Sequence, residues 1–90
     1  MGIAGVKIKI MPTAPDVDLK VIAEKAKELV EKQGGKNREY EEEPVAFGLK
    51  AVIAFFEWDE SKDSEELAKE FEQIDNVISA QIIDVRRLVQ

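Results

Sequence analysis

Residues 49–58, Leu-Lys-Ala-Val-Ile-Ala-Phe-Phe-Glu-Trp, are the stretch of sequence that decides the fold. Apolar side chains occupy both alternating sets of positions: Val52, Ala54, Phe56 and Trp58 in one set, and Ala51, Ile53 and Phe55 in the other. Successive side chains of a strand point to opposite faces, so both faces of this strand are apolar. A strand of this kind is typical of the middle of a sheet.

The segment before this strand has the opposite character. Residues 37–42 are polar, with Tyr40 as the only large apolar side chain, and Gly35 and Pro44 bound them. Charges on an outer strand discourage pairing with the edge of another sheet. We therefore predict an edge strand over residues 37–42.

Two further strands lie nearer the ends of the chain. Val6, Ile8 and Ile10 alternate with lysines, which predicts a strand with one buried face that stops at Pro12 and Pro15. Residues 77–88 begin with the same alternation and then lose its phase. We expect a bulge or twist near Asp84 to explain that slip.

Two segments carry apolar residues at the three- and four-residue steps of an amphipathic helix. The first contains Leu19, Ile22, Ala23, Ala26, Leu29 and Val30, and the second contains Leu67, Ala68, Phe71 and Ile74. Asp16 or Asp18 is placed to cap the first helix, and Gly34-Gly35 to end it. Asp63 and Glu66 have the spacing of a capping box at the start of the second.

The predicted order is strand, helix, strand, strand, helix, strand within a single domain of residues 1–90. We expect an α+β, ferredoxin-like βαββαβ two-layer sandwich: a four-stranded antiparallel sheet with two helices on one face. In that topology the first and third strands are central and the second is at an edge.

The composition narrows the function. There is no cysteine and no histidine, which removes thiolate ligands, disulfides and the commonest general base, so we expect neither an enzyme nor a cofactor nor a metal site. The net charge of −6 disfavours direct nucleic-acid binding. No apolar run is long enough to span a bilayer and the chain starts without a leader pattern, so we expect a cytoplasmic protein without membrane contact.

Several motifs that would indicate a function are absent from this sequence. The sequence lacks a P-loop, and residues 11–16 hold neither a Cys-x-x-Cys pair nor the arginine of an acylphosphatase loop. An RNA-recognition motif would need aromatic side chains on the central strands to stack bases. Residues 46–51 reproduce only its Phe-Gly pair, so RNA binding ranks third among our hypotheses.

Residues 44–50, Pro-Val-Ala-Phe-Gly-Leu-Lys, are the most informative for function. Phe47 either packs into the core or projects as an anchor for a partner. Gly48 would leave room for close approach, and an aromatic ring supplies a large contact area at low entropy cost.

Two charged clusters have a similar choice of interpretations. Residues 39–43, Glu-Tyr-Glu-Glu-Glu, are either a solvated edge strand or a patch that steers a basic partner. Arg86-Arg87 is either solvated or reaches a phosphate or displaces a cation.

The sequence also resembles the archaeal elongation factor 1-beta family, along essentially its whole length. The likeness is carried by Met11-Pro12, by Asp16-Val17-Asp18-Leu19, by Glu42-Glu43-Pro44-Val45-Ala46-Phe47-Gly48-Leu49 and by Asp84-Val85-Arg86-Arg87-Leu88. The resemblance implies a ferredoxin-like exchange factor that promotes GDP release from elongation factor 1-alpha, the GTPase that brings aminoacyl-tRNA to the ribosome.

The resemblance also implies roles for individual residues. In eukaryotic relatives an aromatic at the Phe-Gly position enters a hydrophobic pocket of the GTPase, and a lysine near the chain end intrudes at the magnesium site. By position, Phe47 with Gly48 would be the anchor and Arg87, between Arg86 and Leu88, the intruding cation. Arginine stands here where lysine is expected.

We therefore expect a partner-binding module that is a monomer when free. The alternative is a small-ligand-binding regulatory module of ferredoxin-like topology, which would pair through the apolar outer face of Ile53 and Phe55. Stable self-association that ignores the GTPase would favour that alternative.

Overall fold

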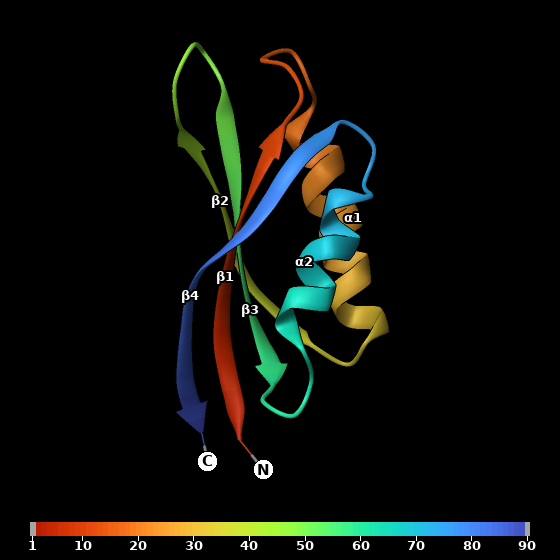
Figure 1. The fold of residues 1–90 in the computed structure, drawn as a ribbon, viewed down its shortest axis with the longest axis vertical. Helices are drawn as coiled ribbons and strands as arrows, with labels where there is room; N and C mark the ends of the chain where they lie inside the picture. The colour runs from red at the N-terminus through yellow and green to blue at the C-terminus, as the bar shows by residue number, and fades with distance from the viewer. Residues whose placement is uncertain (1, 90) are drawn as a thin grey trace.

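A four-stranded antiparallel sheet covered on one face by two helices forms the structure (Figure 1). The computed structural model describes residues 2–89, with Val89 described by its backbone alone. The elements are β1 (Ile3–Pro12), α1 (Leu19–Lys32), β2 (Lys36–Pro44), β3 (Lys50–Asp59), α2 (Ser64–Glu72) and β4 (Val77–Val89). This is the predicted ferredoxin-like fold. No helix within the described residues has the length and apolar character needed to cross a membrane.

The strand order is β2-β3-β1-β4, so β3 and β1 are central and β2 is at an edge, as predicted. β2 is longer than predicted and continues through Pro44, which is in register with Lys50. Proline lacks a backbone N–H, and an edge strand tolerates it because one side of the strand has no ladder to maintain.

The core lies between the sheet and the helices. Its fully buried large side chains are Phe56, Phe71, Ile8, Ile10, Ile22, Leu67, Val6, Val30 and Val52. The Phe56 ring meets the edges of two other aromatic rings, with centroids 5.7 Å from Trp58 and 6.3 Å from Phe71. One alternating set of β3 side chains therefore joins the sheet to α2. Ala51 and Ile53, in the other set, are also buried, although no helix covers their face.

The helix ends follow the sequence signals closely. Asp18, one of the two predicted caps, accepts a hydrogen bond from the Lys20 N–H at 3.0 Å, and Asp63 accepts one from the Glu65 N–H at 2.9 Å. Gly34 after α1 has φ of 87°, a conformation that glycine adopts at little cost. Glu66 makes no return hydrogen bond to Asp63 within the described part of the chain, so only half of the predicted capping box is formed.

The predicted irregularity near Asp84 is present. The register of β1 against β4 shifts between Lys7, which faces Asp84, and Ile8, which faces Ile82, leaving Ile83 as the extra residue. Further shifts occur near each end of β4. Because each extra residue changes the face to which the following side chains point, the apolar phase slips and Ile83 and Val85 remain exposed.

Tyr40 of β2 gives a testable property of this fold. Its hydroxyl donates to Asn37 Oδ1 at 2.7 Å, and the Lys27 ammonium lies 5.0 Å from the ring centroid. Burial, aided by the nearby Glu31 carboxylate, raises the pKa of Tyr40 above its usual range. The folded state therefore favours the neutral phenol. The contribution of this preference to the free energy of unfolding is complete below a pH of about 10 and is lost as the pH rises further.

We expect tyrosinate absorbance near 295 nm to remain absent at pH values somewhat above 10 and to rise only where the fold is lost. The chain has one tyrosine, so the signal has one source. Circular dichroism on the same samples gives the unfolding curve, and Tyr40→Phe provides the blank. Reversible ionisation near pH 10 with intact circular dichroism would contradict the assignment.

Candidate functional site

The hairpin between β2 and β3 presents Phe47 to solvent. The Leu49 N–H donates to the Ala46 carbonyl at 2.9 Å and closes a β-turn that has Phe47 and Gly48 at its centre. The Val45 N–H donates to the Leu49 carbonyl at 2.8 Å and ties the turn to the strands. Phe47 is 96% exposed, so of the two interpretations left open by the sequence, the projecting side chain is the one observed.

The backbone of this turn is strained at Phe47. Its φ is 55° and that of Gly48 is 76°, the sign combination of a type I′ turn. Glycine suits this conformation, but an ordinary side chain pays roughly 1–2 kcal/mol for it. Asn76 also has a positive φ, of 69°, yet asparagine is a residue type that adopts it readily. Phe47 therefore has an unfavourable backbone and almost no contacts in the free chain.

The predicted carboxy-terminal site residues lie on β4. Arg86 Nε is 3.0 Å from Asp84 Oδ2 on the same strand, and Arg87 Nε is 2.7 Å from Glu60 Oε2. A methyl group on Gly5 would lie 3.0 Å from Phe55 Cε1 and 3.1 Å from Leu88 Cδ1. Leu88 thus packs over Gly5 beside Phe55, and the two guanidinium groups are held at the surface.

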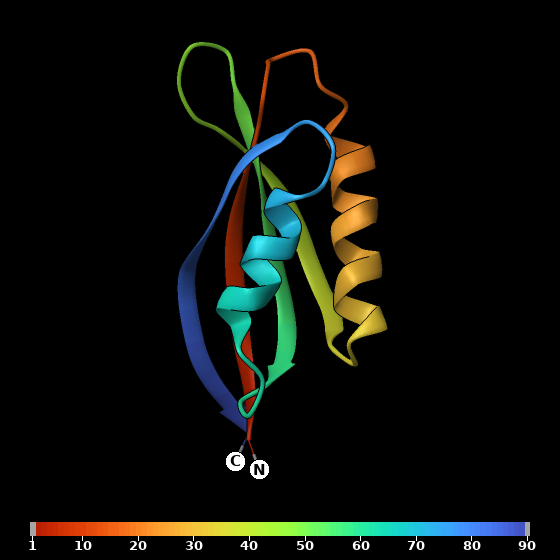
Figure 2. The same ribbon diagram turned by 45° about the vertical axis from the view of Figure 1, so that its right-hand side comes forward.

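The structure does not bring the two predicted parts of the site together. The β2–β3 hairpin lies at one end of the sheet and both chain ends lie at the other (Figures 1 and 2). Arg87 is in register with Ala4, which is in register with Trp58, whereas the hairpin begins before Lys50. Those eight residue steps correspond to about 26 Å along the strand. One partner must therefore be large to contact both.

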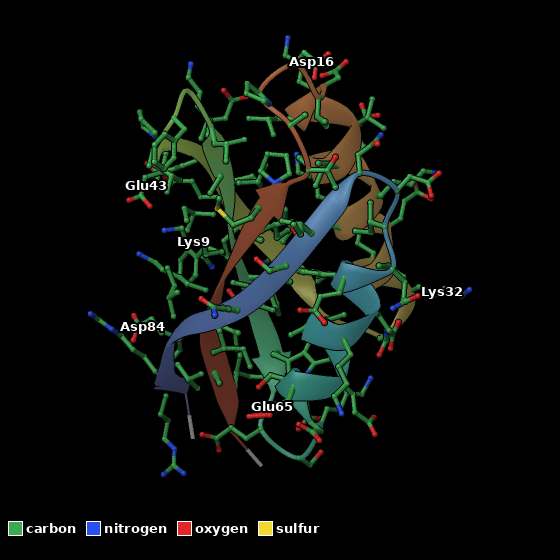
Figure 3. The ribbon with its side chains drawn as sticks, turned by 45° about the horizontal axis from the view of Figure 1, so that its top comes forward. Lys9, Asp16, Lys32, Glu43, Glu65 and Asp84 are labelled. Atoms are coloured by element: carbon green, nitrogen blue, oxygen red, sulfur yellow. The ribbon has the colours of Figure 1, made fainter. Side chains whose placement is uncertain are left out.

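The acidic cluster of residues 39–43 is divided between the faces of the sheet. Glu39, Glu41 and Glu43 are in register with Phe55, Ile53 and Ala51, so they belong to the face without helices, and Glu42 belongs to the other. Glu43 Oε2 lies 3.9 Å from the Lys9 ammonium on that open face (Figure 3). Within the described residues, no three acidic side chains gather in a way that would hold a metal ion.

A separate groove lies on another part of the molecule. A hollow of about 580 Å³ runs between α1 and the segment after α2, and its lining includes Val21, Leu29, Ile74, Lys25 and Glu70. It is on the helical side of the molecule, and neither Phe47 nor Arg87 lines it. Side chains of both charges line the groove, and it is separate from the candidate site.

Glu60, which accepts a hydrogen bond from Arg87, is the residue of the candidate site that the sequence did not reveal. No sequence pattern marked it as a site residue, and it lies 27 positions from Arg87 in the chain. Its proximity follows from the pairing of β3 with β1 and of β1 with β4. Glu60 can be located from the sequence only when the strand order is known and residues are counted along the paired strands.

Comparisons with known proteins find similar sequences over most of the chain. The family described as EF-1 guanine nucleotide exchange domain matches residues 5–88. The chain is 40% identical over 80 residues to elongation factor 1-beta of Methanocaldococcus jannaschii, covering 88% of this chain and 90% of the relative. It is 37% identical over 89 residues to elongation factor 1-beta of Methanosarcina barkeri, covering 98% and 100% of the two chains.

Proposed function

Because this chain belongs to the EF-1 guanine nucleotide exchange domain family, we propose that it grips EF-1-alpha at two points, with Phe47 as anchor and Arg87 as the group that disturbs the nucleotide site. At the level of the family, the chain is a guanine nucleotide exchange factor of the elongation factor 1-beta type. The exposed, strained Phe47 carries the proposal.

Phe47 makes almost no contacts in the free chain, and this supports its proposed role as an anchor. An exposed phenylalanine in a left-handed backbone conformation contributes nothing to the core and lowers the stability of the hairpin. Insertion into an apolar pocket would remove most of its surface from water. Gly48 has open space around it, so no side chain stands between the turn and a partner.

Arg87 lies at the end of the sheet opposite Phe47, and this position supports its proposed role at the nucleotide site. Its side chain is 58% exposed, and its permanent positive charge would compete with the magnesium ion of the loaded GTPase. Arg86 and Leu88 flank it, Leu88 by packing on the sheet and Arg86 by adding positive charge. We assign to Arg87 the disturbance of the magnesium and phosphate region of the GTPase.

The mechanism is one of differential binding, and the chain breaks no covalent bond. An exchange factor accelerates release when it binds the nucleotide-free GTPase more tightly than the loaded form. By reciprocity, nucleotide and magnesium weaken the binding of the factor to the same degree. Contacts at Phe47 would persist in both states, and contacts at Arg87 would favour the empty state.

The deciding experiment is the release of labelled GDP from the cognate EF-1-alpha with and without the chain. We expect acceleration, and we expect affinity for the GTPase to fall when GDP and magnesium are added. Equal affinity for loaded and empty GTPase would overturn the mechanism. A monomer that acts in the cytoplasm, where elongation takes place, is part of the same proposal, and sedimentation of the free chain tests the monomer.

Arg87→Ala separates the two roles. We expect the maximal rate of stimulated release to fall about tenfold, the loss that corresponds to about 1.4 kcal/mol of transition-state stabilisation. The concentration of factor that gives half the effect should change little because Phe47 remains. Arg38→Ala is the matched control, since Arg38 is also a half-exposed arginine in an ion pair, with Glu57. Equal rates for the two variants would remove Arg87 from the mechanism.

A further inference from the structure

We propose that Glu60 is a positioning residue for Arg87: it fixes the inner part of the guanidinium and so directs the outer part towards the GTPase. The proposal rests on the function proposed above for Arg87. It adds a residue from a different loop to the machinery of exchange, and it explains how a long, flexible side chain near the end of an edge strand acquires a defined direction.

The contact itself is specific in its atoms. Arg87 Nε donates to Glu60 Oε2 at 2.7 Å, a distance typical of a charge-assisted hydrogen bond. Nε is the guanidinium nitrogen nearest the backbone. Within the described residues, neither terminal nitrogen of Arg87 has a hydrogen-bond partner. The contact therefore restrains the stem of the side chain and leaves its outer donors for another molecule.

Glu60 is suited to this task because its own backbone is fixed on both sides. Its N–H donates to the Gly2 carbonyl at 3.1 Å, which ties the loop to the start of β1. The preceding Asp59 carboxylate accepts hydrogen bonds from the N–H and the hydroxyl of Ser61, at 2.9 and 2.8 Å. The hydrogen bond from the Ser61 N–H, and to a smaller degree the one from the Ser61 hydroxyl, lowers the pKa of the Asp59 carboxyl group. The Glu60 side chain is 29% exposed, so neighbouring atoms cover most of its surface.

The neighbouring ion pair provides the contrast. Arg86 also donates through Nε, but its acceptor is Asp84, two residues away on the same strand. The Arg86 side chain is 77% exposed. That contact stays within β4. The Glu60 contact joins β4 to the β3–α2 loop, so of the two it alone ties a guanidinium to a different segment of the chain.

Glu60→Gln tests the proposal, because it keeps the size of the side chain and removes the charge. We expect the maximal rate of stimulated GDP release to fall about three- to fivefold, the scale on which an exposed ion pair orders a side chain. Half-saturation should not change, since Phe47 is untouched. Glu60→Asp, which keeps the carboxylate, should recover part of the loss. Glu24→Gln on α1 is the control for charge, and circular dichroism confirms that each variant is folded.

The double variant with Arg87→Ala distinguishes positioning from any other effect of Glu60. If Glu60 acts through Arg87, adding Glu60→Gln to Arg87→Ala changes the rate no further. An undiminished loss in the double variant, or a normal rate in Glu60→Gln alone, would overturn the proposal. Failure of the wild-type chain to accelerate release would instead reject the exchange function, so the two failures are separate.

Discussion

Phe47→Ala is expected to abolish most of the stimulated GDP release at factor concentrations near the wild-type half-saturation point, while the domain stays folded. Truncating an anchor side chain in an interface commonly costs 2 kcal/mol or more, which corresponds to a loss of affinity of roughly 30-fold. The fold should survive, because the ring is 96% exposed and packs against almost nothing. Titration of the variant into EF-1-alpha loaded with labelled GDP, with GDP release as the readout, measures the effect as a shift in half-saturation.

Phe47→Asn provides the stronger form of this test. Asn-Gly is the preferred pair for a type I′ turn, so this change should raise the free energy of unfolding by about 1 kcal/mol. Exchange should be lost as in the alanine variant. A hairpin that becomes more stable while the protein becomes inactive would show that the aromatic is present for the partner alone. Retained exchange in both variants would show that Phe47 is not the anchor.

Phe56→Ala is expected to have the largest effect on stability. Phe56 is fully buried and its ring contacts Trp58 and Phe71. Removing a buried phenylalanine side chain costs about 3–5 kcal/mol, a large part of the total stability of a small domain. Urea denaturation followed by circular dichroism measures the loss.

Phe55→Ala is the matched control for that experiment. Phe55 is the adjacent residue on the other face of β3, only half-buried, with the Lys7 ammonium 5.5 Å from its ring centroid. We expect a loss of less than about half that of Phe56→Ala, because less apolar surface returns to water. Equal losses for the two variants would mean that the core does not lie on the helical side of β3.

The fold could be predicted from the sequence because its local signals agree with one another. The apolar residues of β3, the charges of β2 and the capped pattern of α1 each indicate one position in one topology. The irregularity of β4 was also visible, since a bulge shifts the alternation of side chains. What the sequence could not supply was the exact end of β2, because an edge strand tolerates proline.

The candidate site was harder to predict from the sequence, for physical reasons. Phe47 stands in a turn whose residues are not the usual Asn-Gly, so the pattern did not distinguish a buried ring from an exposed one. The contact between Glu60 and Arg87 depends on two strand registers in succession, and a shift of one residue in either would separate them. Both features appear only when the strands are placed in space.

The separation of Phe47 and Arg87 on one sheet has a consequence for how exchange proceeds. A hydrogen-bonded sheet is a stiff connector, unlike a flexible linker, so if both residues bind the GTPase as proposed, the first contact to form would hold the second at a high effective concentration. The two contacts would then behave as a bivalent ligand whose spacing is set by strand length. Adding or removing a pair of residues in β3 and its neighbours would change that spacing, and avidity would be lost without any change in either contact.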